Sequence, residues 1–194
     1  MGALGIENIN KIKLFSKNEF EKKINLKLRK IVVLITFHPV TLDNIDSKNQ
    51  FSELIKAIDK LDDSTIIFTK PNADMDGRII SKLIDSYVLN NPKKSVSYVS
   101  MGQKLYLTAI KHCDIVIGNS SSGLIEVPSF RKATINIGDR QMGRVKGDSI
   151  INCDPLENSI TKSINKALSK LFVNNLKLTS NPYGIENSSI RILE

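Results

Sequence analysis

The sequence predicts an α/β fold, a doubly wound, Rossmann-like parallel sheet with helices on both faces. Two observations predict it. Short β-branched runs alternate with amphipathic stretches of helical periodicity, and the run at 31–37 is apolar at nearly every position. A strand that is apolar on both sides is covered on both faces, as in parallel sheets. Strands that alternate with helices give a doubly wound sheet, whose ligands bind beyond the carboxyl ends of the strands.

Each element follows from its local pattern. Ser16 and Glu19 form a capping box that begins a helix. Asp154 and Pro155 are expected to open another helix, because proline is favoured at the first helical position. The expected strands cover 31–37, 65–69, 96–99, 114–117, 133–137 and 149–152. The expected helices cover 47–60, 77–89, 103–112 and 155–171, and the segment 121–130 is expected to start as a helix.

Composition restricts the class of protein. A chain of 194 residues, 41% hydrophobic and 25% charged, suits one globular domain. Its net charge of +8 would suit nucleic acid, a membrane surface or an anionic small ligand. The lysines are scattered and tryptophan is absent, and a solvated helix end explains the cluster of Lys27, Arg29 and Lys30. No apolar run approaches the ~18 residues of a membrane span, so we expect neither nucleic acid nor membrane as a partner.

The two cysteines fit a reduced compartment. Cys113 and Cys153 lie far apart and match no metal-ligand spacing, so each is expected to be a buried apolar residue. No signal-peptide pattern follows Met1. A cytoplasmic location without a metal site is therefore the expectation.

Polar residues follow the first two strands. His38 is kept extended by Pro39, and an imidazole at a strand end could donate to a phosphate or move a proton. A histidine satisfied by the local backbone is an equally good explanation. Asp74 and Asp76 form a carboxylate pair after the second strand, where capping of the next helix by Asp74 is the better explanation.

The segment after the fourth strand, 118–126, reads Gly-Asn-Ser-Ser-Ser-Gly-Leu-Ile-Glu. Free amides at a helix start, the helix dipole and three serine hydroxyls suit a phosphate. Glu126 would repel a phosphate and suits the hydroxyls of a ribose. The simpler alternative is a turn whose serines cap the helix.

Two other motifs fail in this segment. Gly118 and Gly123 have the spacing of a P-loop, but Leu124 stands where the required lysine would be, which argues against an ATPase. Ser121 has a glycine two positions later but Asn119 two positions earlier, so the nucleophile elbow is incomplete. Both histidines also precede the serines, which is the wrong order for an α/β-hydrolase.

A third polar segment, 136–144, follows the fifth strand. Arg140 and Arg144 have the forked donors that grip phosphate, and the glycines allow close approach of the backbone to a ligand. A solvated loop would explain this segment alone. Three such segments at strand ends favour a shared site.

Together these segments resemble the hydrolysing UDP-N-acetylglucosamine 2-epimerases of the sialic and legionaminic acid pathways. The matching segments, in matching order and spacing, are 2–8, 36–41, 118–127, 136–144 and 181–184. The resemblance implies the C-terminal half of a glycosyltransferase-B type fold. Residues 1–194 would be one UDP-binding domain, with a crossover helix at 181–194, and the catalytic N-terminal domain would be absent from this chain.

The resemblance also implies the ligands and the reaction. The partners would be UDP, UDP-N-acetyl sugars and the N-terminal domain, in a homo-oligomeric full-length protein. UDP is eliminated to leave an acetamidoglycal, and water then adds to give the free sugar inverted at C2, without metal or cofactor. His38 would be catalytic. The UDP-binding residues would be Ser120, Ser121, Ser122, Gly123, Glu126, Arg140 and Arg144.

The carboxylates of that reaction lie largely in the N-terminal domain of the family, so this chain alone is expected to bind UDP-sugar without turning it over. Two alternatives stay open: the donor-nucleotide domain of a glycosyltransferase-B type transferase, and a non-catalytic UDP-binding regulatory module. Whether the sugar is N-acetylglucosamine or N,N'-diacetylbacillosamine also stays open.

Overall fold

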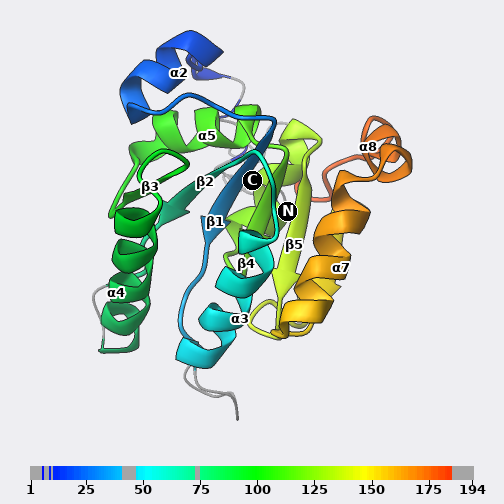
Figure 1. Cartoon of the computed structure of the whole chain (residues 1–194). Helices are drawn as coiled ribbons and strands as arrows, with labels where there is room; N and C mark the ends of the chain where they lie inside the picture. The colour runs from blue at the N-terminus through cyan, green and yellow to red at the C-terminus, as the bar shows by residue number, and fades with distance from the viewer. Residues whose placement is uncertain (1–5, 7–8, 10, 41–46, 73–74, 185–194) are drawn as a thin grey trace, which may run out of the picture.

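The computed structural model describes residues 6, 9, 11–40, 47–72 and 75–184, and these form one sheet covered by helices on both faces (Figure 1). All the strand pairs are parallel, and the strand order is β3-β2-β1-β4-β5-β6. The strands are β1 Ile31–Thr36, β2 Ser64–Thr69, β3 Ser95–Tyr98, β4 Ile115–Gly118, β5 Ala133–Ile137 and β6 Ile150–Cys153. This is the order of the dinucleotide-binding doubly wound folds, so the predicted fold class is confirmed.

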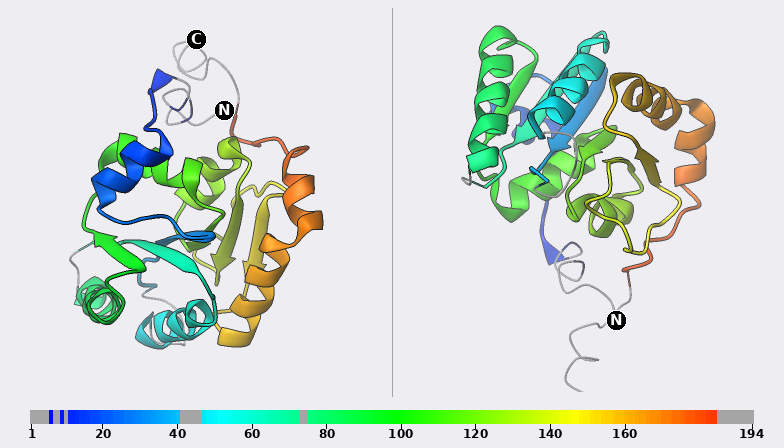
Figure 2. Two further views of the ribbon diagram at one scale, coloured as in Figure 1. Left: turned by 45° about the horizontal axis from the view of Figure 1, so that its top comes forward. Right: turned by 90° about the horizontal axis from the view of Figure 1, so that it is seen from below.

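The helices form two layers (Figure 2, left). One layer packs with Val33 and Ile35 of β1, the other with Val32 and Leu34, because successive side chains of a strand point to opposite faces. The first layer contains α3 Ser47–Asp59, α4 Met75–Asn90, α7 Glu157–Leu168 and α8 Lys170–Leu176. The second contains α2 Lys17–Ile24, α5 Gly102–His112, α6 Ser122–Ile125 and the 3₁₀ helix η1 Val127–Phe130.

The segment 121–130 starts as a helix, as predicted, but it does not continue as one α-helix. α6 ends at Ile125, and the chain continues as the tighter turn η1. Pro128 explains the break, because its ring lacks an N–H and would clash with the carbonyl of Leu124 in a continuous α-helix.

The helix predicted at 155–171 is wrong at both ends. Leu156 is the N-cap of α7 in an extended conformation, so Pro155 precedes the helix instead of opening it. Ser169 is also extended and ends α7, and its side chain accepts a hydrogen bond from the Phe172 amide at 3.3 Å. A serine N-cap thus begins α8 where one continuous helix was expected.

Other predictions fall as follows. The capping box of Ser16 and Glu19 is present. Cys113 is buried and Cys153 half-buried, and both are free thiols. The expected cap Asp74 and most of the expected crossover helix, 185–194, lie outside the described residues. Within 181–184 the chain makes a turn, in which the Tyr183 amide donates to Asn181 Oδ1 at 2.9 Å.

Candidate functional site

The predicted site residues lie at the carboxyl edge of the sheet, around the ends of the neighbouring strands β1 and β4. The chain leaves β1 toward β2 on one side and leaves β4 toward β5 on the other, so the topological switch point lies between these two strand ends. His38 follows β1, residues 120–122 (the serine loop) follow β4, and Arg140 follows β5. Ligands of doubly wound sheets bind at this place in the fold.

Gly118 lets β4 end close against β1. Its φ is +147°, and a Cβ atom there would lie 1.9 Å from the carbonyl oxygen of Thr36. The amide of the next residue, Asn119, donates to that same oxygen at 3.2 Å. A side chain at position 118 would therefore push apart the two strand ends that carry His38 and the serine loop.

Asn119 joins the three loops of the site. Its side chain accepts from the His38 amide at 2.7 Å and donates to the His38 carbonyl at 2.8 Å. Its own carbonyl accepts from the Arg140 guanidinium at 3.1 Å and from Gln141 Nε2 at 2.8 Å. Asn119 is 1% exposed, so these bonds are shielded from water. The sequence prediction did not name Asn119 as a site residue, although a polar residue directly after a buried strand was a signal.

The serine loop contains donors that bond no acceptor among the described residues. α6 is one turn long, so the predicted contribution of a helix dipole is small, and individual groups matter more. Ser121 is the N-cap of α6, but its side chain makes no capping hydrogen bond, which removes the simpler explanation for this serine. The amides of Ser120 and Ser121 donate to no group in the described part of the chain. These groups remain available to an anion.

Gly123 has a packing role of its own. A Cβ atom at this position would lie 2.8 Å from the Thr134 methyl group, and the Thr134 hydroxyl donates to the Gly123 carbonyl at 2.7 Å. The glycine therefore lets α6 lie directly on β5. This contact fixes the position of the serine loop relative to β5.

Glu126 is the C-cap of α6 and carries a half-buried carboxyl group. Burial raises its pKa, because the charged form loses hydration. Within the described residues it takes part in no salt bridge. A carboxylate next to donors that suit a phosphate is itself suited to accept from the hydroxyl groups of a ribose.

The two predicted arginines differ in their surroundings. Arg140 is held near the serine loop by its bond to the Asn119 carbonyl. Arg144 lies further along the same loop with an exposed side chain, and among the described residues it forms no hydrogen bond or ion pair with the other predicted residues. Gln141 between them is 2% exposed, and its Oε1 has no hydrogen-bond partner among the described residues.

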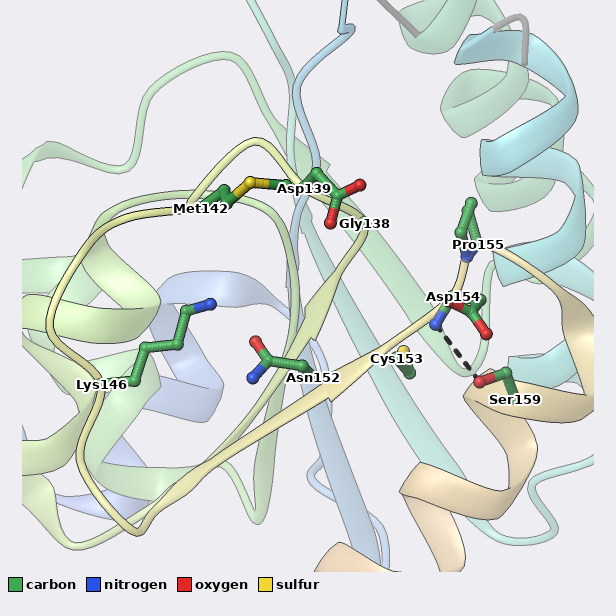
Figure 3. A pocket seen from close by; sticks show the side chains of 9 residues that line it. All are labelled: Gly138, Asp139, Met142, Lys146, Asn152, Cys153, Asp154, Pro155 and Ser159. Atoms are coloured by element: carbon green, nitrogen blue, oxygen red, sulfur yellow. Dashed lines mark hydrogen bonds between the residues drawn. The ribbon is translucent and has the colours of Figure 1, made fainter. Parts of the chain in front are cut away.

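Both arginines lie in the loop 138–149 between β5 and β6, the arginine loop. This loop borders a hollow of about 410 Å³ beyond the ends of β5 and β6 (Figure 3). The side chains of Lys146 and Asn152 point into it. Across the hollow the Asp154 amide donates to Ser159 Oγ at 3.3 Å. The sequence prediction missed these residues, although Asn152 and Asp154 stand at the end of a predicted strand. The lining residues are Gly138, Asp139, Met142, Lys146, Asn152, Cys153, Asp154, Pro155 and Ser159.

The turn at 181–184 braces the site from outside the sheet. The Asn181 side-chain amide donates to the Ile125 carbonyl at 2.8 Å and to Ser129 Oγ at 2.6 Å. The Tyr183 hydroxyl donates to the Val145 carbonyl at 2.9 Å. The turn therefore links α6 and η1 to the arginine loop.

The described residues contain no group of three or more His, Cys, Asp or Glu side chains arranged to hold a metal ion. None of the helices in 6–184 that the structure describes has the length and apolar character to cross a membrane.

Two curated relatives align with most of the length of this chain. The chain is 37% identical over 175 residues to the GDP/UDP-N,N'-diacetylbacillosamine 2-epimerase (hydrolyzing) of Campylobacter jejuni, which covers 90% of this chain and 45% of that protein. It is 39% identical over 191 residues to the polysialic acid biosynthesis protein P7 of Escherichia coli, covering 98% and 48%. The chain thus spans about half the length of these relatives.

A solved structure shares the fold. The structure of S. aureus MnaA with UDP superposes with a TM-score of 0.72 at 16% identity, covering 99% of this chain and 50% of that one. At this identity the likeness concerns the fold alone. The model of the family described as UDP-N-acetylglucosamine 2-epimerase matches residues 1–194. The chain belongs to the UDP-N-acetylglucosamine 2-epimerase family.

Proposed function

We propose that this chain is the UDP-sugar-binding half of a hydrolysing 2-epimerase that acts on a UDP-N-acetyl sugar. Residues 1–194 would form one nucleotide-binding domain, and the remaining half of the site would come from an N-terminal domain. The observation that carries the proposal is the set of Asn119 bonds, which holds His38 and Arg140 around the serine loop at the switch point. The Campylobacter jejuni relative, described as a hydrolysing diacetylbacillosamine 2-epimerase, supports the reaction class.

The proposed roles follow from the donors and acceptors of the site. The serine hydroxyls, the free amides of Ser120 and Ser121 and the guanidinium of Arg140 would donate to the diphosphate. Arg144 and Gly123 would complete that contact, the glycine through its backbone. Glu126 would accept from the ribose hydroxyls.

The proposed reaction has two steps. A base removes the C2 proton while the C1–O bond to UDP breaks, which leaves a C1=C2 double bond. Water then adds its hydroxyl to C1, and a proton returns to C2 from the opposite face. His38, at the end of β1, would donate a hydrogen bond to the departing phosphate, and the base would come from the N-terminal domain. This chain alone would therefore bind UDP without turnover.

Calorimetric titration of UDP into the purified chain tests the proposal. Arg140→Ala should weaken binding by about tenfold or more, because a hydrogen bond to a charged group contributes ~1.5–3 kcal/mol. Glu126→Ala should weaken it as well, through the ribose. Arg29→Ala is the matched control, since this exposed arginine bonds the Lys93 carbonyl and lies before β1, at the opposite edge of the sheet.

Unchanged UDP binding in both site variants would place the nucleotide elsewhere and contradict the assigned roles. A chain that binds no UDP, even when the N-terminal half of a relative is added in trans, would contradict the proposed function itself.

A further inference from the structure

Tyr106 of α5 reaches the serine loop from a position that no motif marked. Its hydroxyl is hydrogen-bonded to Ser122 Oγ. This bond links α5 directly to the serine loop.

The surroundings keep Tyr106 a proton donor. Its ring packs against the apolar cluster that α5 forms with β1 and β4. Burial raises the pKa of Tyr106, so the phenol keeps its proton at neutral pH. A hydroxyl group has one proton to donate and two lone pairs with which to accept. When Tyr106 donates to Ser122 Oγ, the proton of Ser122 is free to point outward.

We propose that Tyr106 is a positioning residue of the nucleotide site, whose hydroxyl holds the Ser122 side chain, and with it the loop 120–122, in the orientation that donates to a diphosphate. This inference rests on the proposed function, because it requires UDP at this loop. Tyr106 does not touch the ligand. It acts by fixing a serine that would otherwise be free to change rotamer.

The test compares UDP with uridine, which lacks the diphosphate. Both ligands are titrated, and chemical shifts followed by nuclear magnetic resonance, in the wild-type chain, Tyr106→Phe, Ser122→Ala and the double variant. Tyr106→Phe should weaken UDP binding about 5- to 10-fold, the range of one hydrogen bond, and leave uridine binding unchanged. Ser122→Ala should cause a similar loss, and the double variant should bind UDP no more weakly than either single variant.

Tyr87→Phe is the matched control, since Tyr87 is a buried tyrosine on α4 that packs in the opposite helix layer. It should bind both ligands like the wild type. Equal loss of UDP and uridine binding in Tyr106→Phe would mean that Tyr106 acts through packing, and additive losses in the double variant would mean that it acts independently of Ser122. Either result overturns the inference, as does unchanged UDP binding.

These failures are distinct from failure of the proposed function. If UDP binding depends on Arg140 and Glu126 but not on Tyr106, the nucleotide site stands and this inference alone falls. If the wild-type chain binds no UDP, both fall together.

Discussion

Asn119 bonds both main-chain polar groups of His38, accepting from the amide at 2.7 Å and donating to the carbonyl at 2.8 Å. The two residues are 81 positions apart in the sequence, so this pair closes the end of β1 onto the end of β4. Neither strand end can move without breaking the pair. The backbone of His38 is thereby held at the end of β1.

Asn119→Ala removes both of these bonds and should lower the free energy of unfolding by about 2–4 kcal/mol, because two main-chain groups lose their partner in a buried place. It should also weaken UDP binding, since Arg140 and the serine loop lose their fixed relation to β1. Urea unfolding and UDP titration measure the two effects. Asn119→Asp keeps the acceptor for the His38 amide but sets a carboxylate oxygen against the His38 carbonyl, so it should restore little. Wild-type stability in Asn119→Ala would contradict the structural role.

Gly118→Ala should be among the most damaging single substitutions in the sheet. The added Cβ would lie 1.9 Å from the Thr36 carbonyl oxygen at a φ of +147°, so the strands must separate. We expect a loss of more than about 3 kcal/mol in the free energy of unfolding. Gly143→Ala is the matched control, because φ is +78° there but nothing lies within 4 Å. It should cost only the ~1–2 kcal/mol of a left-handed backbone, and equal losses at both positions would contradict the crowding at Thr36.

Glu126 should make stability depend on pH in a known direction. Its folded-state pKa is raised by burial, so the folded chain binds this proton more tightly than the unfolded chain. Stability from this group is therefore fully present below the unfolded pKa of about 4.3 and declines as the pH rises through the raised folded pKa. Glu126→Gln removes the decline, so its stability advantage over the wild type should be larger at pH 7 than at pH 4.

The same variant should bind UDP several-fold more weakly, because an amide has fewer acceptors for the ribose hydroxyls than a carboxylate. Chemical unfolding at the two pH values, paired with UDP titration at pH 7, measures both effects. A stability advantage that is the same at pH 4 and pH 7 would show that Glu126 does not titrate as described.

The two cysteines should react slowly with thiol reagents in the native chain. Burial raises the pKa of Cys113 to about 12 and that of Cys153 to about 11, and the thiolate is the reactive form. Cys153 is half-buried and lines the hollow of Figure 3, so it should label first. Cys113 should label only as fast as the chain unfolds. Time-resolved mass spectrometry of maleimide labelling measures both rates, and the Cys153→Ser variant isolates the reaction of Cys113. A Cys113 that reacts as fast as an exposed thiol would contradict its burial.

The sheet could be predicted because its signal is local. The run at 31–37 is apolar on both sides, and that alone indicates a strand between two helix layers. The break at Pro128 was also readable, since proline inside a helix ends it. The cap at Ser169 was less so, because serine is common on exposed helix faces and only its extended backbone marks the new helix start.

The site could be predicted only as a set of loops. His38, Arg140 and the serines stand directly after strands, and that position is visible in the sequence. Asn119 and Tyr106 act through partners that the packing of the sheet brings near. Tyr106 lies inside α5, where it reads as one more apolar residue of the helix, and its link to Ser122 depends on how α5 lies over β1 and β4.

Because of the strand order, β1 is synthesised well before one of its two partner strands. β4 is the second neighbour of β1 in the sheet. The Val32 amide donates a hydrogen bond to the Asp114 side chain, which comes 82 residues later in the sequence. At roughly 5–20 residues per second, the ribosome needs about 4–16 s to supply that partner. During this interval one edge of the most apolar strand is unpaired in the nascent chain. The strand order that places the proposed nucleotide site at the ends of β1 and β4 thus also leaves an apolar strand edge open to aggregation and to chaperones during synthesis.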